Sequence, residues 1–187
     1  MRTQPLVISV VLAALGAACV ALPRPTCTAA PGAPAIAITL VYGMNAPTAR
    51  IGRDLQVAAW PDGRLVWAID PDHPDAGWLE SRVEPEHVAA LLDDLCARGV
   101  FEDEDFWRPH YGPDGDYVVI QLVSGTDCIR LRSWHELFGM SGFDLMDGRE
   151  ASRRFLAAWS DIRMTVAGWI PATGVPCAEP MDLKGMW

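Results

Sequence analysis

Residues 55–69 read LQVAAWPDGRLVWAI, two apolar runs on either side of a Pro-Asp-Gly turn. This turn, at 61–63, is typical of a type I turn followed by a glycine bulge, which joins two antiparallel strands. Pairing Trp60 with Arg64 gives the hairpin one uniformly apolar face, whereas a shorter turn would mix the two faces. The apolar face then carries Leu55, Val57, Ala59, Leu65, Trp67 and Ile69. The stretch therefore predicts a hairpin with one buried face.

A second hairpin is predicted over residues 117–134, YVVIQLVSGTDCIRLRSW. A two-residue turn at 125–126 would place Ile120 opposite Leu131 and keep one face apolar. The other face would carry Val119, Gln121, Arg130 and Arg132. Two shorter strands are expected at 36–42, where apolar residues alternate, and at 78–83.

Two segments have the periodicity of amphipathic helices. The first covers 85–98, with proline at its first position and Gly99 after its end. The second covers 149–168, ahead of Pro171. Their apolar stripes are Val88, Leu91, Leu92 and Leu95, and Phe155, Leu156, Trp159, Ile162 and Val166.

The order of these elements predicts an α+β domain. We expect an antiparallel sheet of five or six strands, built from the two hairpins, with both helices packed on one face. The single domain would cover residues 36–171, a common size for a domain. Residues 172–187 contain proline and glycine and are expected to form an irregular tail.

The first 19 residues, MRTQPLVISVVLAALGAAC, have the layout of a bacterial export signal, with Arg2 ahead of an apolar run. Their end, LGAAC at 15–19, resembles the lipobox of bacterial prolipoproteins, although Gly16 stands where the strict motif has leucine. The resemblance covers about a tenth of the chain. It implies cleavage before Cys19, acylation of that cysteine with fatty acids such as palmitate, and a membrane anchor facing the periplasm or the exterior.

Two other outcomes of export stay open. Cleavage after Ala30 would release a secreted protein. Alternatively, the signal stays uncleaved as a membrane anchor, because the apolar residues 6–22 reach the short end of the lengths that span a bilayer. Residues 20–35, VALPRPTCTAAPGAPA, are rich in proline and alanine and read as a tether ahead of the folded domain.

The chain has five cysteines, and acylation of Cys19 would leave an even number in an oxidising compartment. We expect a disulfide between Cys27 and Cys177, because both lie in flexible segments at the ends of the domain and chain ends often lie close together. Cys96 and Cys128 would then remain. The predicted register puts them on different faces, so a reduced, buried Cys96 is as much expected as a bridged one.

The formal net charge of −9 argues against nucleic acid as a partner, because an acidic chain repels phosphate backbones. Residues 70–75 are acidic, but they lack the spacing of a calcium-binding loop, and none of the histidines forms a zinc motif. We therefore expect no metal and no cofactor.

Two features are candidates for function. Trp60 lies at a hairpin tip on the face opposite the apolar one, and an exposed tryptophan there, or Trp107, would suit a binding surface. The acidic run 102–105, with Asp114 and Asp116, would suit hydrolysis of an envelope polysaccharide. With no defined catalytic motif, the sequence favours a non-enzymatic lipoprotein domain that binds or scaffolds another envelope component, a protein or a saccharide. The hydrolase is the alternative.

Overall fold

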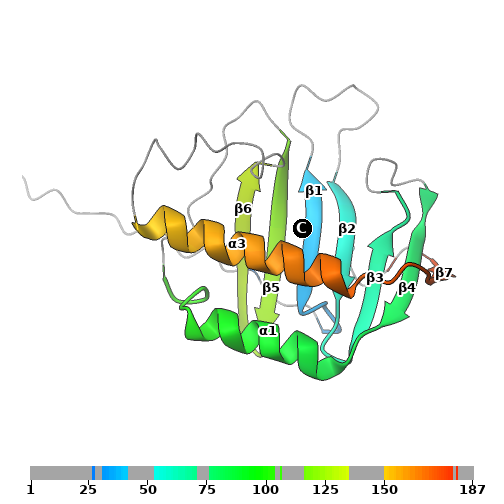
Figure 1. Ribbon diagram of the computed structural model, residues 1–187, viewed down its shortest axis with the longest axis horizontal. Coiled ribbons are helices and arrows are strands. Elements are labelled where there is room, and N and C mark those ends of the chain that lie inside the picture. Colours follow the sequence, from blue (N-terminus) through cyan, green and yellow to red (C-terminus); the bar gives the residue numbers. More distant parts are fainter. Residues whose placement is uncertain are drawn as a thin grey trace, which may run out of the picture.

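The structure is a computed structural model of the chain. It describes residues 27, 31–41, 53–70, 76–103, 106, 116–134, 150–178 and 180. The elements are β1 (Ile36–Val41), β2 (Arg53–Ala59), β3 (Arg64–Ala68), β4 (Trp78–Arg82), α1 (Pro85–Ala97), β5 (Tyr117–Ser124), β6 (Asp127–Trp134), α3 (Glu150–Trp169) and β7 (Val175–Cys177). Figure 1 shows both helices in front of one sheet, so the predicted α+β class is confirmed.

Within the described residues the sheet has seven strands in the order β6-β5-β1-β2-β3-β4-β7, all antiparallel. The expected five or six strands were too few because β7 lies inside the segment 172–187, which we expected to be irregular. A three-residue strand containing Pro176 has no alternating pattern to detect. Its pairing with β4, in which Leu79 faces Pro176, makes it a strand.

The register of the first hairpin is confirmed. Val57 pairs with Trp67, and the Trp60 N–H donates to the Arg64 carbonyl at 2.8 Å, as the glycine bulge requires. Leu65, Trp67 and Val57 are buried together on the helix-covered face. The turn at 61–63 therefore determined the pairing.

Two members of the predicted apolar face lie elsewhere. The β1–β2 register shifts between Ile38 and Thr39, so Ile38 faces Val57 but Thr39 faces Leu55. This bulge turns Leu55 to the opposite face, where it joins a second buried cluster. Ile69 follows the end of β3 and is 49% exposed. The strict alternation that we assumed along both strands was therefore wrong at these two positions.

We expect Gly63→Ala to cost roughly 2–3 kcal/mol of unfolding free energy, from a left-handed backbone together with a steric collision. Gly63 has a φ of +83°, and an added Cβ would collide with the Val83 carbonyl oxygen. Gly125→Ala is the matched control, because its φ is +60° but nothing lies within 4 Å of the added atom. Urea denaturation of both variants measures the difference, and equal losses would contradict the collision.

The second hairpin also has the predicted register. Ser124 faces Asp127 across the two-residue turn, and Ile120 faces Leu131. Residues 118, 120, 122, 129 and 131 point toward the helices and are buried there. The agreement follows from the turn, which admits only one pairing that keeps this face apolar.

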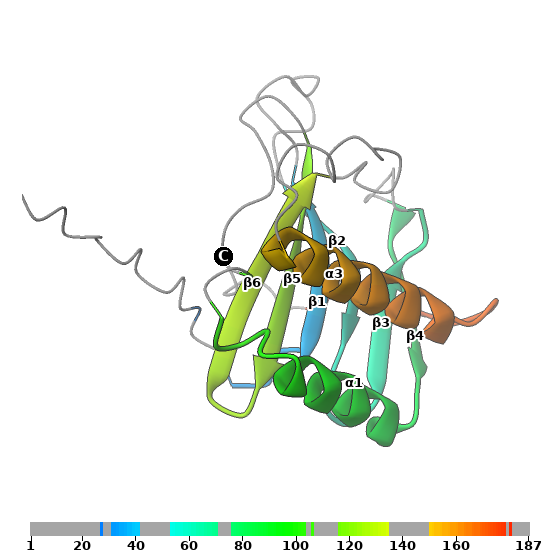
Figure 2. The same cartoon turned by 60° about the vertical axis from the view of Figure 1, so that its left-hand side comes forward.

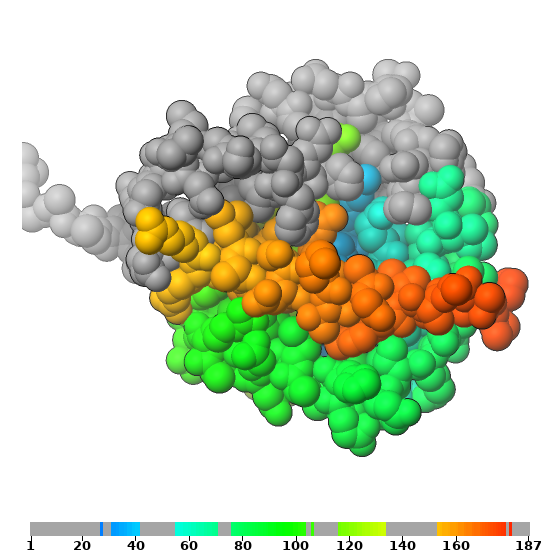
Figure 3. Space-filling view, viewed as in Figure 1, coloured from blue at the N-terminus to red at the C-terminus, as the bar shows by residue number. Residues whose placement is uncertain are grey.

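Both helices begin and end within one residue of the predicted bounds. Figure 3 shows them side by side across the sheet. Two ion pairs at 2.7 Å tie α3 to the residues that follow α1: Arg98 with Asp161, and Arg154 with Asp103. None of the helices in the described part of the chain combines the length and apolar character needed to span a bilayer.

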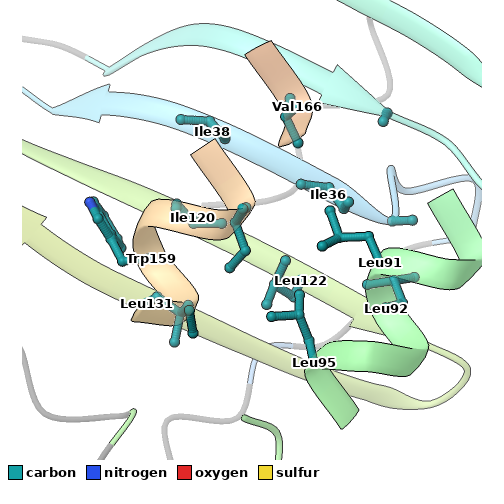
Figure 4. Packing of buried hydrophobic residues seen from close by; sticks show 14 of the residues in the cluster. Ile36, Ile38, Leu91, Leu92, Leu95, Ile120, Leu122, Leu131, Trp159 and Val166 are labelled. Atoms are coloured by element: carbon teal, nitrogen blue, oxygen red, sulfur yellow. The ribbon is translucent and has the colours of Figure 1, made fainter. Parts of the chain in front are cut away.

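The main core fills the space between the helices and the sheet (Figure 4). Leu95 of α1, Trp159 of α3 and Ile120 of β5 are all essentially inaccessible to solvent. Phe155 stacks on Trp159 with ring centroids 5.6 Å apart. Because the helices cover this face, any exposed functional surface of the sheet has to lie on its other face or at its edges.

Candidate functional site

The face of the sheet opposite the helices carries its own apolar cluster, which we call the Trp60 cluster. Its buried members are Ala37, Leu55, Ala58, Trp60 and Val66, and Trp78 and Cys177 pack against it. They come from β1, β2, β3, β4 and β7 and from the residue after β2. No helix of the described chain covers this face, so another segment must contribute to the burial of the cluster (Figure 1).

Trp60 is buried, not exposed as expected, with 6% of its surface accessible. Its indole N–H donates to the Gly32 carbonyl at 2.8 Å, so the segment before β1 lies against it. The Arg64 guanidinium lies 4.6 Å from the centre of the ring. Sequence reasoning treated residues 20–35 as a free tether, and this is why it left Trp60 uncovered.

Arg64 continues this arrangement toward the next strand. Its Nε lies 3.1 Å from a Glu80 carboxylate oxygen, and both side chains are partly exposed. Trp60, Arg64 and Glu80 therefore form a connected row that runs from the residue after β2 to β3 and β4. A partly exposed ion pair of this kind contributes little to stability. Its main consequence is that the Arg64 guanidinium is held over the Trp60 ring.

Cys177 lies beside this row as a free thiol. Burial raises its pKa, nearby Glu80 raises it further, and Arg64 acts in the opposite direction. A raised pKa keeps the thiol protonated at neutral pH, and a protonated thiol is a poor nucleophile. The surroundings of Cys177 therefore suit a structural role in packing better than a role as a catalytic nucleophile.

We expect iodoacetamide to alkylate Cys177 at least several-fold more slowly than Cys96 at pH 8. Cys96 is exposed, whereas Cys177 is half-buried and its pKa is raised, so less of it is thiolate at this pH. Mass spectrometry of tryptic peptides over a time course gives both rates in one sample. Faster modification of Cys177 than of Cys96 would contradict a half-buried thiol with a raised pKa.

The disulfide joins Cys27 to Cys128, with 5.3 Å between their Cα atoms. The expected pair Cys27–Cys177 is therefore wrong, because Cys177 lies in β7, where it pairs with Trp78. Cys128 lies on the face opposite the helices, as the predicted register required. Cys96 belongs to α1 and is a free, exposed thiol, not a buried one.

The acidic candidates are only partly described. Asp103 is engaged in its ion pair with Arg154, while Glu102 and Asp116 are exposed. Several candidates lie outside the described residues: Cys19, residues 71–75, Glu104, Asp105, Trp107 and Asp114. In the part of the chain that the structure describes, no three His, Cys, Asp or Glu side chains are grouped to hold a metal ion.

No family model matches this sequence, and neither does any curated protein. Sequence reasoning placed Trp60 opposite Arg64 but missed that Glu80 and Cys177 join them. The missing information was the position of β7, which brings Cys177 beside β4.

Proposed function

We propose that this protein is a lipid-anchored envelope domain that binds another component of the bacterial envelope and does not catalyse a reaction. The anchor would be Cys19, acylated at the mature N-terminus. The bound component would be a protein or a saccharide on the periplasmic or exterior side of the membrane.

The disulfide between Cys27 and Cys128 is the observation that carries this proposal. Disulfides persist in oxidising compartments, which include the periplasm and the cell surface. The bridge also fastens the N-terminal segment to β6. Only residues 20–26 separate the bridge from Cys19, so the domain would sit within roughly 28 Å of the acylated cysteine.

Two of the described reactive groups are poorly suited to hydrolysis. The Asp103 carboxylate is held by Arg154, and burial together with Glu80 keeps the Cys177 thiol protonated. A general acid or nucleophile needs a group that is free to exchange protons or attack. Neither of these two groups meets that requirement.

The anchor is tested by the mass of the mature protein purified from native membranes. An acylated cysteine at position 19 is expected, and Cys19→Ala should abolish both the lipid mass and membrane retention. Cys96→Ser is the matched control, which should leave both unchanged because Cys96 lies on an exposed helix surface. A mature N-terminus at Pro31 without lipid would refute the anchor.

Binding is tested separately by purification of the native complex in mild detergent. A component present in a fixed ratio to this protein, and still bound after a salt wash, is the expected result. Release of reducing sugar from envelope polysaccharide by the purified protein, lost in Glu102→Gln, would refute the proposal in favour of a hydrolase.

A further inference from the structure

One corner of the face opposite the helices is accessible to solvent. β4 and β7 are the last two strands at one end of the described sheet, and both helices lie on its other face (Figures 1 and 2). On the face without helices, β4 carries Trp78 and Glu80, which pair with Cys177 and Val175 of β7. Toward β1 and β2 this face is buried, and Ala58 is only 1% exposed. The four residues of β4 and β7, which we call the Trp78 patch, are all at least partly exposed.

The floor of the Trp78 patch is apolar. Trp78 is partly exposed, and its backbone lies between β3 and β7, so the exposure belongs mainly to its side chain. The one polar atom of that side chain, Nε1, is sealed from solvent. What the indole presents to solvent is therefore ring carbon. Val175, at 70% exposure, adds its methyl groups beside this ring.

Glu80 gives the patch a hydrogen-bond acceptor. Its Oε2 accepts from the Arg64 Nε at 3.1 Å, and its side chain is 35% exposed. A carboxylate can accept about four hydrogen bonds, so Glu80 can also accept from a ligand. The ion pair with Arg64 balances the charge of Glu80, and the patch therefore favours a neutral ligand over a charged one.

This combination fits a saccharide better than a protein. A pyranose ring has a face of C–H groups, which packs on an aromatic ring, and hydroxyl groups at its rim, which donate to a carboxylate. A stable protein interface buries roughly 800 Å² on each partner, more than four partly exposed residues on two adjacent strands provide.

We propose that the Trp78 patch binds a neutral saccharide of the envelope, with its sugar ring on Trp78 and Val175 and its hydroxyl groups donating to Glu80. The inference rests on the proposed binding function and selects a saccharide as the bound component. Four side chains cover little of a ligand, so we expect dissociation constants in the millimolar range.

Two β-1,4-linked trisaccharides, chitotriose and cellotriose, serve as probes because their rings have flat C–H faces. On titration of isotope-labelled protein, the NMR signals of the Trp78 indole and of the Val175 and Cys177 amides should shift with at least one of them. The same ligand should slow alkylation of Cys177 by iodoacetamide in proportion to the occupied fraction. Alkylation of Cys96, which is exposed on α1, should not change.

Variants separate the contributions of the patch. Trp78→Ala should weaken binding by about tenfold or more, because it removes the platform for the sugar ring. Val175→Ala and Glu80→Gln alter exposed or partly exposed side chains, so both should stay folded, and each should weaken binding by at least about threefold. Met164→Ala, at a position 69% exposed on α3, is the matched control and should bind as the wild type does.

Absence of shifts with both trisaccharides, or unchanged affinity in the Val175 and Glu80 variants, would overturn the saccharide site. Release of a co-purifying protein by Trp78→Ala would also overturn it, because the patch would then dock a protein. Either result would leave the anchored binding function standing if a component still co-purifies with the native protein. Conversely, a mature protein without lipid that binds a trisaccharide through Trp78 would refute only the anchor.

Discussion

Trp67→Ala is expected to lower the unfolding free energy by about 3–5 kcal/mol, the usual cost of removing a large buried aromatic side chain. Trp67 is 6% exposed and belongs to the main core between the sheet and the helices. Its ring also lies against Gly174, just before β7. The substitution should therefore open a cavity and loosen β7, which faster exchange of the Val175 and Cys177 amides would report.

The contact between Trp67 and Gly174 can be isolated by a double-mutant cycle. A Cβ at Gly174 would lie 2.7 Å from Cζ2 of Trp67 and 3.0 Å from Cβ of Leu79, so Gly174→Ala should destabilise the native protein. In the Trp67→Ala background the cavity can accept the added methyl group, and the cost should largely disappear. Val175→Ala, at a position 70% exposed, is the control. A Trp67→Ala loss below about 1 kcal/mol would contradict its burial.

The sequence predicted best where a turn set the register. The Pro-Asp-Gly turn at 61–63 and the two-residue turn at 125–126 each allow one pairing that keeps a face apolar, and both pairings are present. The two helices were equally accessible to prediction, because proline at 85 and glycine at 99 mark the bounds of the first. These signals are local, since a few neighbouring residues contain all the information.

Most of the errors concern contacts between distant parts of the chain. Leu55 changes face because of a bulge that depends on the pairing of β2 with β1, two strands separated by a loop. Trp60 is covered because the Gly32 carbonyl, 28 residues earlier, accepts its N–H. β7 becomes a strand only by pairing with β4. No periodic pattern within these segments indicates what lies on top of them.

The candidate site was less predictable than the fold for the same reason. Trp60 and Arg64 are near neighbours in sequence, but Glu80 and Cys177 reach them from strands further along the chain. The disulfide depends on where the segment before β1 crosses the sheet. The proximity of chain ends is a weak guide to the partner of Cys27. The face on which Cys128 lies was correctly predicted, and it would have excluded Cys96 as the partner of Cys128.

Removing the disulfide by Cys27→Ser with Cys128→Ser is expected to cost roughly 4–5 kcal/mol, the chain-entropy value for a loop of about 100 residues. The bridged cysteines are separated by 101 positions. In the unfolded state the bridge prevents most of the chain from expanding, so its loss lowers the free energy of the unfolded ensemble. Cys96→Ser is the control, because Cys96 is exposed and unbridged, and it should change stability by less than about 0.5 kcal/mol.

Urea denaturation distinguishes this entropic effect from a simple loss of contacts. The slope of unfolding free energy against urea rises with the surface exposed on unfolding, so the unbridged chain should show a steeper slope than the wild type. Loss of packing around Cys128 alone would lower the midpoint and leave the slope unchanged. A loss below about 1 kcal/mol with no change of slope would show that the bridge does not constrain the unfolded chain. The N-terminal segment would then have to be held against Trp60 by the Gly32 hydrogen bond and its packing.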